Sequence, residues 1–205
     1  MPTKNFLKNK QGMTIIEILI ALAIFGLIIG AISAFAADTV SLRGVIFQGL
    51  SGEQEAKKII RPMANEIRSA TQSSVGSFMI KAAEPYRFTF YADTNGDGLK
   101  EEISYYLDGT VMKRSSITPA GAPLSYDEDD AVVVSLVHNV VSAPGIFFYY
   151  DTNYDGTTAA LTAPIDLLQV RLVKITLTID ADPNRPPAPI DIETQVSIRN
   201  LKDNF

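Results

Sequence analysis

Residues 11–30 read QGMTIIEILIALAIFGLIIG, and this stretch decides how the amino-terminal part of the chain folds. A short basic leader ends at Gly12, and a long apolar run follows it with a single carboxylate, Glu17. An ionised side chain in a bilayer costs about 2.5–3.5 kcal/mol at a helix centre on insertion scales. Since a segment that served only as an anchor would carry leucine there, we expect this one to do something besides sit in lipid.

The apolar run is long enough to cross a membrane. Met13–Ala37 spans about 25 residues, which as a helix reach roughly 37 Å. Lys4, Lys8 and Lys10 precede the run, and no acidic residue lies among the first twelve. The positive-inside rule therefore predicts a single-pass inner-membrane protein with its amino terminus in the cytoplasm and its head outside.

Composition restricts what the head can do. The chain has 205 residues, of which 18 are basic and 23 acidic, and three of the lysines belong to the leader. An acidic head argues against direct binding of nucleic acid, which needs a basic surface. There is no cysteine, so disulfides and thiolate chemistry are excluded.

The string KQGMTIIE at residues 10–17 resembles the prepilin cleavage and methylation site of type IV pilins and type II secretion pseudopilins. The resemblance implies cleavage between Gly12 and Met13 by a prepilin peptidase and methylation of the new amino group of Met13. Glu17 then takes the place of the family's glutamate, although phenylalanine is commoner than methionine at the first mature position. The implied partners are other pilin or pseudopilin subunits, the peptidase, the inner-membrane assembly platform, and the bilayer before assembly into a periplasmic or extracellular filament.

Glu17 has a predicted role in assembly. Apolar helices pack side by side in a filament, and a carboxylate among them needs a partner. The free amino terminus of an adjacent subunit would supply it. Two other interpretations stay open: a plain anchor, which leaves Glu17 unexplained, and a secreted hydrolase whose signal peptide ends near Ala34-Phe35-Ala36.

The predicted class is α+β, with a long amino-terminal helix packed on an antiparallel β head, as in pilins. The segments are a leader (1–12), a transmembrane or filament-core helix (13–37), an amphipathic helix (38–75) and the head (76–205). Gly44, Gly49 and Gly52 interrupt the second helix, which Ser51 and Gln54 can restart as a capping box. Pro62 should kink it or begin a fresh turn.

Alternating or apolar runs predict the strands of the head, over 86–92, 102–107, 111–114, 132–137, 146–150, 168–179 and 190–199. A slip in the alternation between Leu172 and Val173 predicts a bulge. The proline-rich stretch 182–189 predicts a stiff loop. The strings MANEIRSA (63–70) and VSIRNL (196–201) also resemble minor pilins of the J/W type, which favours a minor pseudopilin of type II secretion. The alternative is a minor subunit of a type IV pilus used for adhesion, motility or DNA uptake.

Two acidic loops are near repeats of the pattern D-x-N-x-D-G, and each follows an aromatic strand. Oxygen ligands at alternate positions suit a hard cation such as Ca²⁺. The candidate ligands are Asp93, Asn95, Asp97, the Leu99 carbonyl and Glu101 in the first loop and, more weakly, Asp151, Asn153 and Asp155 in the second. The same pattern also makes a good turn without metal. A membrane-tethered, calcium-dependent binding protein is therefore an alternative function from another class.

No residue pattern selects an enzymatic reaction. The sequence offers no identifiable Ser-His-Asp set, phosphate loop or histidine–cysteine metal cluster. The acidic run Asp127–Asp130 is typical of a solvated loop, and the single histidine, His138, lies at the end of an apolar run. A glycosidase needs only two carboxylates, but nothing selects a pair, and we expect a structural subunit rather than an enzyme.

Overall fold

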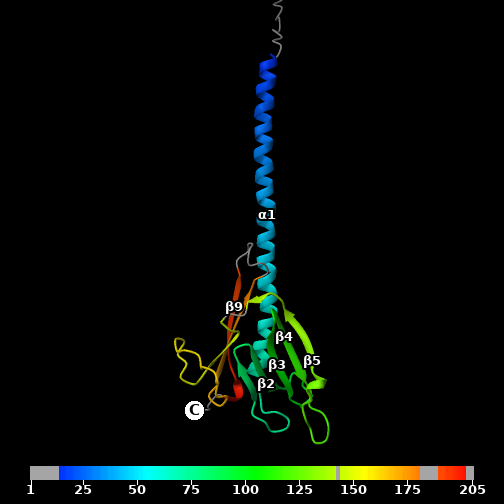
Figure 1. Ribbon diagram of the computed structural model, residues 1–205, viewed down its shortest axis with the longest axis vertical. Helices are drawn as coiled ribbons and strands as arrows, with labels where there is room; N and C mark the ends of the chain where they lie inside the picture. Colours follow the sequence, from blue (N-terminus) through cyan, green and yellow to red (C-terminus); the bar gives the residue numbers. More distant parts are fainter. Residues whose placement is uncertain (1–13, 142–143, 181–188, 202–205) are drawn as a thin grey trace, which may run out of the picture. The chain divides into compact units, whose positions relative to one another are not determined.

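The computed structural model describes residues 14–141, 144–180 and 189–201, with only the backbone for 37, 38 and 40–56. The chain divides into two compact units, residues 1–46 and 47–205, which we describe separately. The first unit is helical throughout its described part, apart from Thr14. The second contains the end of the same helix and the β head (Figure 1).

Helix α1 (Ile15–Arg68) contains 54 residues. Its backbone is helical through Gly44, Gly49 and Gly52, so the predicted interruption and restart are wrong. Each glycine lowers helix stability by only about 1 kcal/mol relative to alanine, which does not by itself end a helix. Pro62 also lies inside the helix rather than at a new beginning.

The helix ends at Arg68, seven residues before the predicted boundary at 75. Its last turn tightens, because the Ala70 N–H donates to the Ile67 carbonyl oxygen at 3.2 Å. The Thr71 N–H then donates to the carbonyl oxygen of Tyr91, at 2.8 Å. The backbone therefore leaves the helix by bonding to the sheet.

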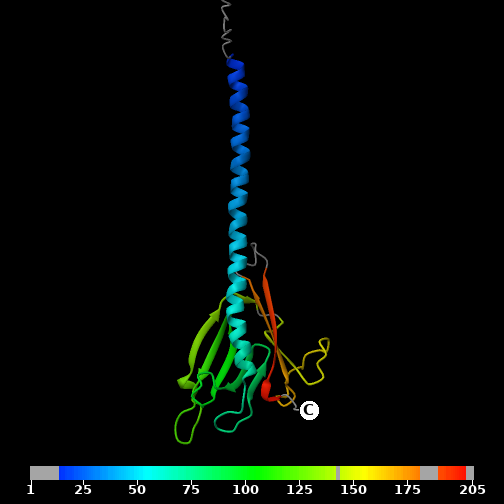
Figure 2. The ribbon, with the colours of Figure 1, turned by 180° about the vertical axis from the view of Figure 1, so that it is seen from behind.

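Nine strands form two antiparallel sheets in the described head (Figures 1 and 2). The first is a meander in chain order, made of β1 (Ile80–Glu84), β2 (Arg87–Ala92), β3 (Glu101–Asp108), β4 (Val111–Ile117) and β5 (Val132–Val137). The second contains β6 (Val140–Val141), β7 (Phe147–Tyr150), β8 (Leu172–Ile179) and β9 (Ile190–Ser197). Strand β8 lies at its centre, with β9 along one edge and β6 and β7 along the other. The head also contains two short 3₁₀ helices, η1 (Glu128–Asp130) and η2 (Arg199–Leu201).

The predicted α+β class is confirmed, but one strand was predicted wrongly. Strand β8 begins only at Leu172, and no bulge separates Leu172 from Val173, which pair in regular register with Ser197 and Val196. The preceding residues form a turn in which the Asp166 carboxylate accepts from the Leu168 N–H at 3.0 Å. Strands β1 and β6 were not predicted, and the proline-rich stretch lies outside the described residues except for Pro189.

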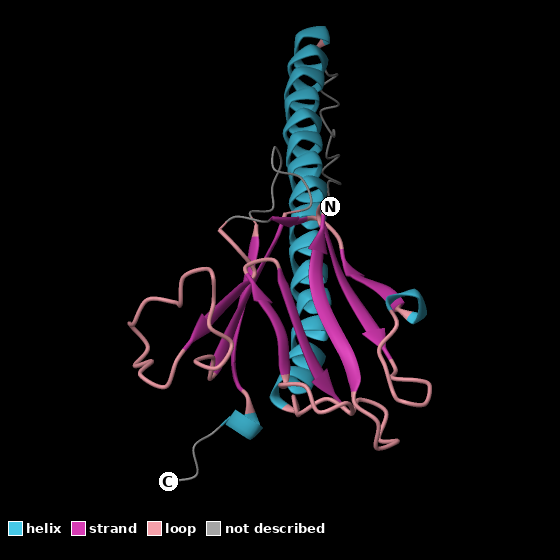
Figure 3. Cartoon of the chain, turned by 60° about the horizontal axis from the view of Figure 1, so that its bottom comes forward, coloured by secondary structure: helices cyan, strands magenta, loops and turns pink. Residues whose placement is uncertain are grey.

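One core joins the end of α1 to both sheets (Figure 3). Ile60, Met63 and Ile67 recur at helical spacing and are at most 5% exposed. They pack in one cluster with buried aromatic residues of β2, β3 and β7, which are Phe88, Phe90, Tyr105, Phe147 and Tyr149. Because each large apolar side chain contributes about 1.5–3 kcal/mol when fully buried, this face of the helix stabilises the head.

A polar contact also holds the helix on the sheet. The Glu66 carboxylate oxygen Oε2 accepts from the Tyr105 hydroxyl at 2.8 Å and from Arg114 Nε at 3.0 Å. The Arg114 and Glu66 side chains are only 19% and 23% exposed. Burial, and then the Glu66 charge, raises the pKa of Tyr105 well above its usual range. Glu66 therefore links α1 to β3 and β4 at a site largely shielded from water.

Replacing Glu66 with alanine should lower the free energy of unfolding of the head by roughly 1–3 kcal/mol, because two buried donors lose their acceptor. Glu66→Gln, which keeps an acceptor, should lie between this variant and the native protein. The matched control is Glu193→Ala, which removes the more exposed Lys174–Glu193 pair and should change stability by less than about 1 kcal/mol. Denaturant unfolding of the full chain in detergent, followed by tyrosine fluorescence, measures all three; equal effects of Glu66→Ala and Glu193→Ala would contradict the account.

Candidate functional site

A capping box begins the apolar helix. The Glu17 carboxylate accepts from the Thr14 N–H at 2.8 Å and from the Thr14 hydroxyl at 3.1 Å. In return, the Thr14 hydroxyl oxygen accepts from the Glu17 N–H at 3.3 Å. Thr14 is the residue before the first helical position and Glu17 is the third helical residue, which is the arrangement of a capping box. Two backbone donors that a helix start leaves unpaired are thus satisfied.

This contact changes the interpretation of Glu17. Leucine at position 17 could not accept these hydrogen bonds, so even a plain anchor has a structural reason to carry glutamate there. An unsatisfied N–H in lipid costs several kcal/mol. The assembly role of Glu17 stays a prediction, and Gly12 and Met13 lie outside the described residues.

The helix segment after the capping box has the properties of a membrane span. Ile15–Ala36 is 22 residues long, has a mean hydropathy of 2.8, and contains no residue that is buried within the structure. Leu27 is 76% exposed and Phe35 73% exposed. Because so much apolar surface is unfavourable in water, we expect lipid or other apolar helices to cover it.

In the first acidic loop, the side chains of Asp93, Asn95 and Asp97 accept hydrogen bonds from the loop's own backbone. Asp93 accepts from the N–H groups of Gly96 at 2.7 Å and Gly98 at 3.1 Å. Asn95 and Asp97 make the corresponding turn contacts to the N–H groups of Asp97 and Leu99. Gly96 and Gly98 both have a positive φ, which the chain needs to make this tight loop.

A cation already lies among the oxygens of this loop. The Lys100 ammonium is 3.2 Å from Asp93 Oδ2 and 3.0 Å from the Gly98 carbonyl oxygen. Burial raises the pKa of Asp93, but the Gly96 N–H and the Lys100 ammonium lower it more, so it lies below its usual range. The loop therefore presents at least two oxygens to one positive charge.

Glu101 lies at the end of the loop and is only 3% exposed. Its Oε2 accepts from the N–H and the hydroxyl of Thr94, at 2.8 and 2.9 Å. Its Oε1 is buried and has no hydrogen-bond partner in the part of the chain that the structure describes. A buried carboxylate oxygen without a hydrogen-bond partner is unfavourable.

The second acidic loop is a hydrogen-bonded turn. Asp155 Oδ1 accepts from the N–H groups of Thr157 and Thr158 at 2.8 and 2.9 Å, and from both hydroxyls. These donors, the Thr157 N–H first, hold the pKa of Asp155 well below its usual range. Asp151 likewise accepts from the N–H and the side-chain amide of Asn153. These hydrogen bonds agree with the interpretation of the second loop as a turn that forms without metal.

The predicted calcium ligands are not assembled into one group. Among residues 14–141, 144–180 and 189–201, no three acidic, histidine or cysteine side chains lie together in a way that could hold a metal ion. Asp93, Asp97 and Glu101 thus share a loop without converging. Calcium binding there would need the side chains to leave the backbone groups that they now cap.

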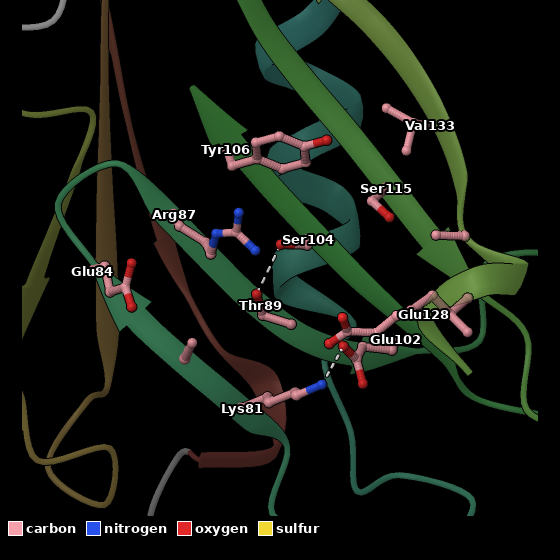
Figure 4. A pocket seen from close by; sticks show the side chains of 13 residues that line it. Lys81, Glu84, Arg87, Thr89, Glu102, Ser104, Tyr106, Ser115, Glu128 and Val133 are labelled. Atoms are coloured by element: carbon pink, nitrogen blue, oxygen red, sulfur yellow. Dashed lines mark hydrogen bonds and ion pairs between the residues drawn. The ribbon is translucent and has the colours of Figure 1, made fainter. Parts of the chain in front are cut away.

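A polar groove that the sequence analysis did not identify lies on the first sheet (Figure 4). Its volume is about 640 Å³, and its lining comes from all five strands and η1. Three contacts cross its floor: Lys81 Nζ to Glu102 Oε1 at 2.6 Å, Thr89 to Ser104 at 2.8 Å, and the Arg87 guanidinium over the Tyr106 ring at 4.8 Å. Polar residues at every second position of β2 and β3 were the signal that could have predicted it. Such a groove suits a polar or charged partner.

The comparisons with known proteins bear on the amino terminus. Residues 7–33 match the prokaryotic N-terminal methylation motif, and this range includes Gly12, Met13 and Glu17. A comparison with curated proteins found no match. The motif implies processing by a prepilin peptidase and assembly with other pilins. The chain therefore carries, at its amino terminus, the prepilin-type cleavage and methylation motif of pilins and pseudopilins.

Proposed function

We propose that the chain is a minor pseudopilin, a structural subunit of a type II secretion pseudopilus that supports protein export. The observation that carries the proposal is an exposed apolar helix, most of which lies within a prepilin-type processing motif. A plain anchor needs no cleavage site. A secreted enzyme would lose the segment rather than expose it for packing against other helices.

Fewer observations support the assignment as a minor subunit of the J/W type. The two strings that resemble this group, residues 63–70 and 196–201, lie together in the head. The Asn200 side-chain amide donates to the Ala70 carbonyl oxygen at 2.8 Å, and Ile198 and Ala70 are fully buried. A minor subunit of a type IV pilus is the runner-up, because it would share these features.

In this proposal Glu17 has two successive partners. Before assembly its carboxylate caps the helix through Thr14. Cleavage after Gly12 places a new amino group on Met13, directly before Thr14. In the filament, the carboxylate pairs with such an amino group on a neighbouring subunit, and the pair compensates two charges held among apolar helices.

Mass spectrometry of the amino-terminal peptide from the native host tests the proposal. We expect a chain that begins with N-methylated Met13. Gly12→Leu should leave the leader attached, because a bulky side chain occupies the position before the cleaved bond, whereas the neighbouring control Gln11→Ala should be processed normally. An intact Met1 would instead support a tethered protein, and cleavage near Ala36 would support secretion.

We propose calcium binding by the first acidic loop as a second function. Two observations support it. The Lys100 ammonium lies between Asp93 and the Gly98 carbonyl oxygen, and within the described residues one buried oxygen of Glu101 has no hydrogen-bond partner. Asp93, Asn95, Asp97, the Leu99 carbonyl and Glu101 would supply the oxygen ligands. Lys100 competes for the same oxygens and would have to move away.

Calcium at millimolar concentration should then raise the melting temperature of the full chain in detergent. The rise should be larger in Lys100→Met, because the competing ammonium is gone, and should vanish in Asp97→Ala. Asp155→Ala in the second loop is the matched control and should keep the calcium response. If neither the native protein nor Lys100→Met responds to calcium, the loop is only a turn.

A further inference from the structure

Strand β5 is the outermost strand of the first sheet. It pairs with β4, and no other strand in the described part of the head pairs with it. Figures 1 and 2 show its other edge open. An open edge presents backbone N–H and C=O groups to which a further strand can add.

Apolar side chains cover both faces of the first half of β5. Val132 is 62% exposed, Val133 49% and Val134 48%. Successive side chains of a strand point to opposite faces. Val133 lines the polar groove (Figure 4), so Val132 and Val134 belong to the opposite face. At the end of the strand Val137 is buried in the core, so only the first half is uncovered.

The edge strand β9 of the second sheet is protected by charged side chains. Strand β9 alternates apolar residues with Asp191, Glu193 and Gln195, and charged residues on an edge strand prevent pairing with other chains. Strand β5 reads VVVSLV and carries no charge, proline or glycine. An unprotected edge rich in β-branched residues is suited to strand addition.

The charges next to β5 indicate what kind of strand would fit. Glu128, Asp129 and Asp130 form η1 directly before β5, and all three are exposed. Within the described chain, none of them forms an ion pair. A basic residue on an added strand would meet these carboxylates, and the attraction would favour its binding.

A second copy of this chain fits the edge less well. Two β5 strands paired antiparallel would bring each η1 to the other end of the partner strand, where the flanking residues are His138 and Asn139. These residues offer no permanent positive charge to the acidic run. The charge pattern therefore favours a different protein.

We propose that the open edge of β5 is a docking site for an extended segment of another protein, which adds as a sixth strand to this sheet. The segment has alternating apolar residues that cover the valines and Lys or Arg residues at the end that meets Glu128–Asp130. This inference goes beyond the proposed function, because strand addition does not depend on cleavage after Gly12 or on incorporation into a filament.

Synthetic peptides test the docking site on the full chain in detergent. The probes are KKVTVTVT and VTVTVTKK, which allow either strand direction, and the controls are EEVTVTVT and VTVTVTEE. Hydrogen exchange measured by mass spectrometry should show slower exchange of the amides of residues 132–137 with one basic probe. The acidic probe of the same direction should bind at least about tenfold more weakly, since like charges would meet.

Two sets of variants separate edge pairing from unspecific attraction. Val132→Lys/Val134→Lys places charges on the edge and should abolish the protection, whereas Leu168→Lys, at a residue that is 64% exposed, adds charge elsewhere and should not. Asp129→Lys/Asp130→Lys should reverse the preference toward the acidic probes. Both substituted pairs are exposed, so unchanged circular dichroism should accompany these results.

Three results would overturn the proposal. One is the absence of protection by any probe at millimolar concentration. Another is that basic and acidic probes bind the native chain equally and that Asp129→Lys/Asp130→Lys does not change the binding of either. The third is a dimer of the native chain that forms without peptide and is lost in Val132→Lys/Val134→Lys, because the occupant would then be a second copy.

Discussion

The apolar surface of Ile15–Ala36 is the constraint on which the rest of the molecule depends. None of its residues is buried within the chain. Since each large apolar side chain gains about 1.5–3 kcal/mol from full burial, the segment is stable only in lipid or against other apolar helices. The prepilin-type motif at residues 7–33 implies cleavage just before this helix. In the proposed function Glu17 bonds to Thr14 while the helix lies in the bilayer, and it would pair with an amino group of a neighbouring subunit in the filament.

In the head, one half-buried helix is attached to two sheets. Apolar residues of the helix, among them Met63 and Ile67, enter a core with the aromatic residues of β2, β3 and β7. Glu66 adds a directional contact to Tyr105 and Arg114. The core explains why the helix binds the sheet, and the Glu66 contact specifies at which residues of β3 and β4 it does so.

Much of this could be predicted from the sequence because the signals are periodic. The apolar run, the helical spacing of Ile60, Met63 and Ile67, and the alternation in the strands each specify one local structure. The errors have local causes. The Asp166 turn replaces the first residues of the strand predicted from Leu168. The helix continues through three glycines because a cost of about 1 kcal/mol per glycine does not by itself end a helix.

The features of the site were harder to predict because they depend on contacts rather than on spacing. Thr14 and Glu17 match the capping-box pattern, but so do Ser51 and Gln54, where the helix continues without a new beginning. Lys100 lies outside the D-x-N-x-D-G pattern, so its approach to Asp93 is visible only in three dimensions. The uncovered valines of β5 likewise depend on the order of the strands, which places β5 at the edge of its sheet.

The central claim is that the charge of Glu17, and not only its capping contact, drives assembly. Glu17→Gln separates the two, because glutamine can also complete a capping box but carries no charge. Thr14→Ala is its counterpart, since it removes the capping hydroxyl and keeps the charge. The measurement is the fraction of each full-length variant that is incorporated into filaments in the native host. The account predicts that Glu17→Gln is strongly impaired and Thr14→Ala only mildly; equal incorporation of Glu17→Gln and the native protein would contradict it.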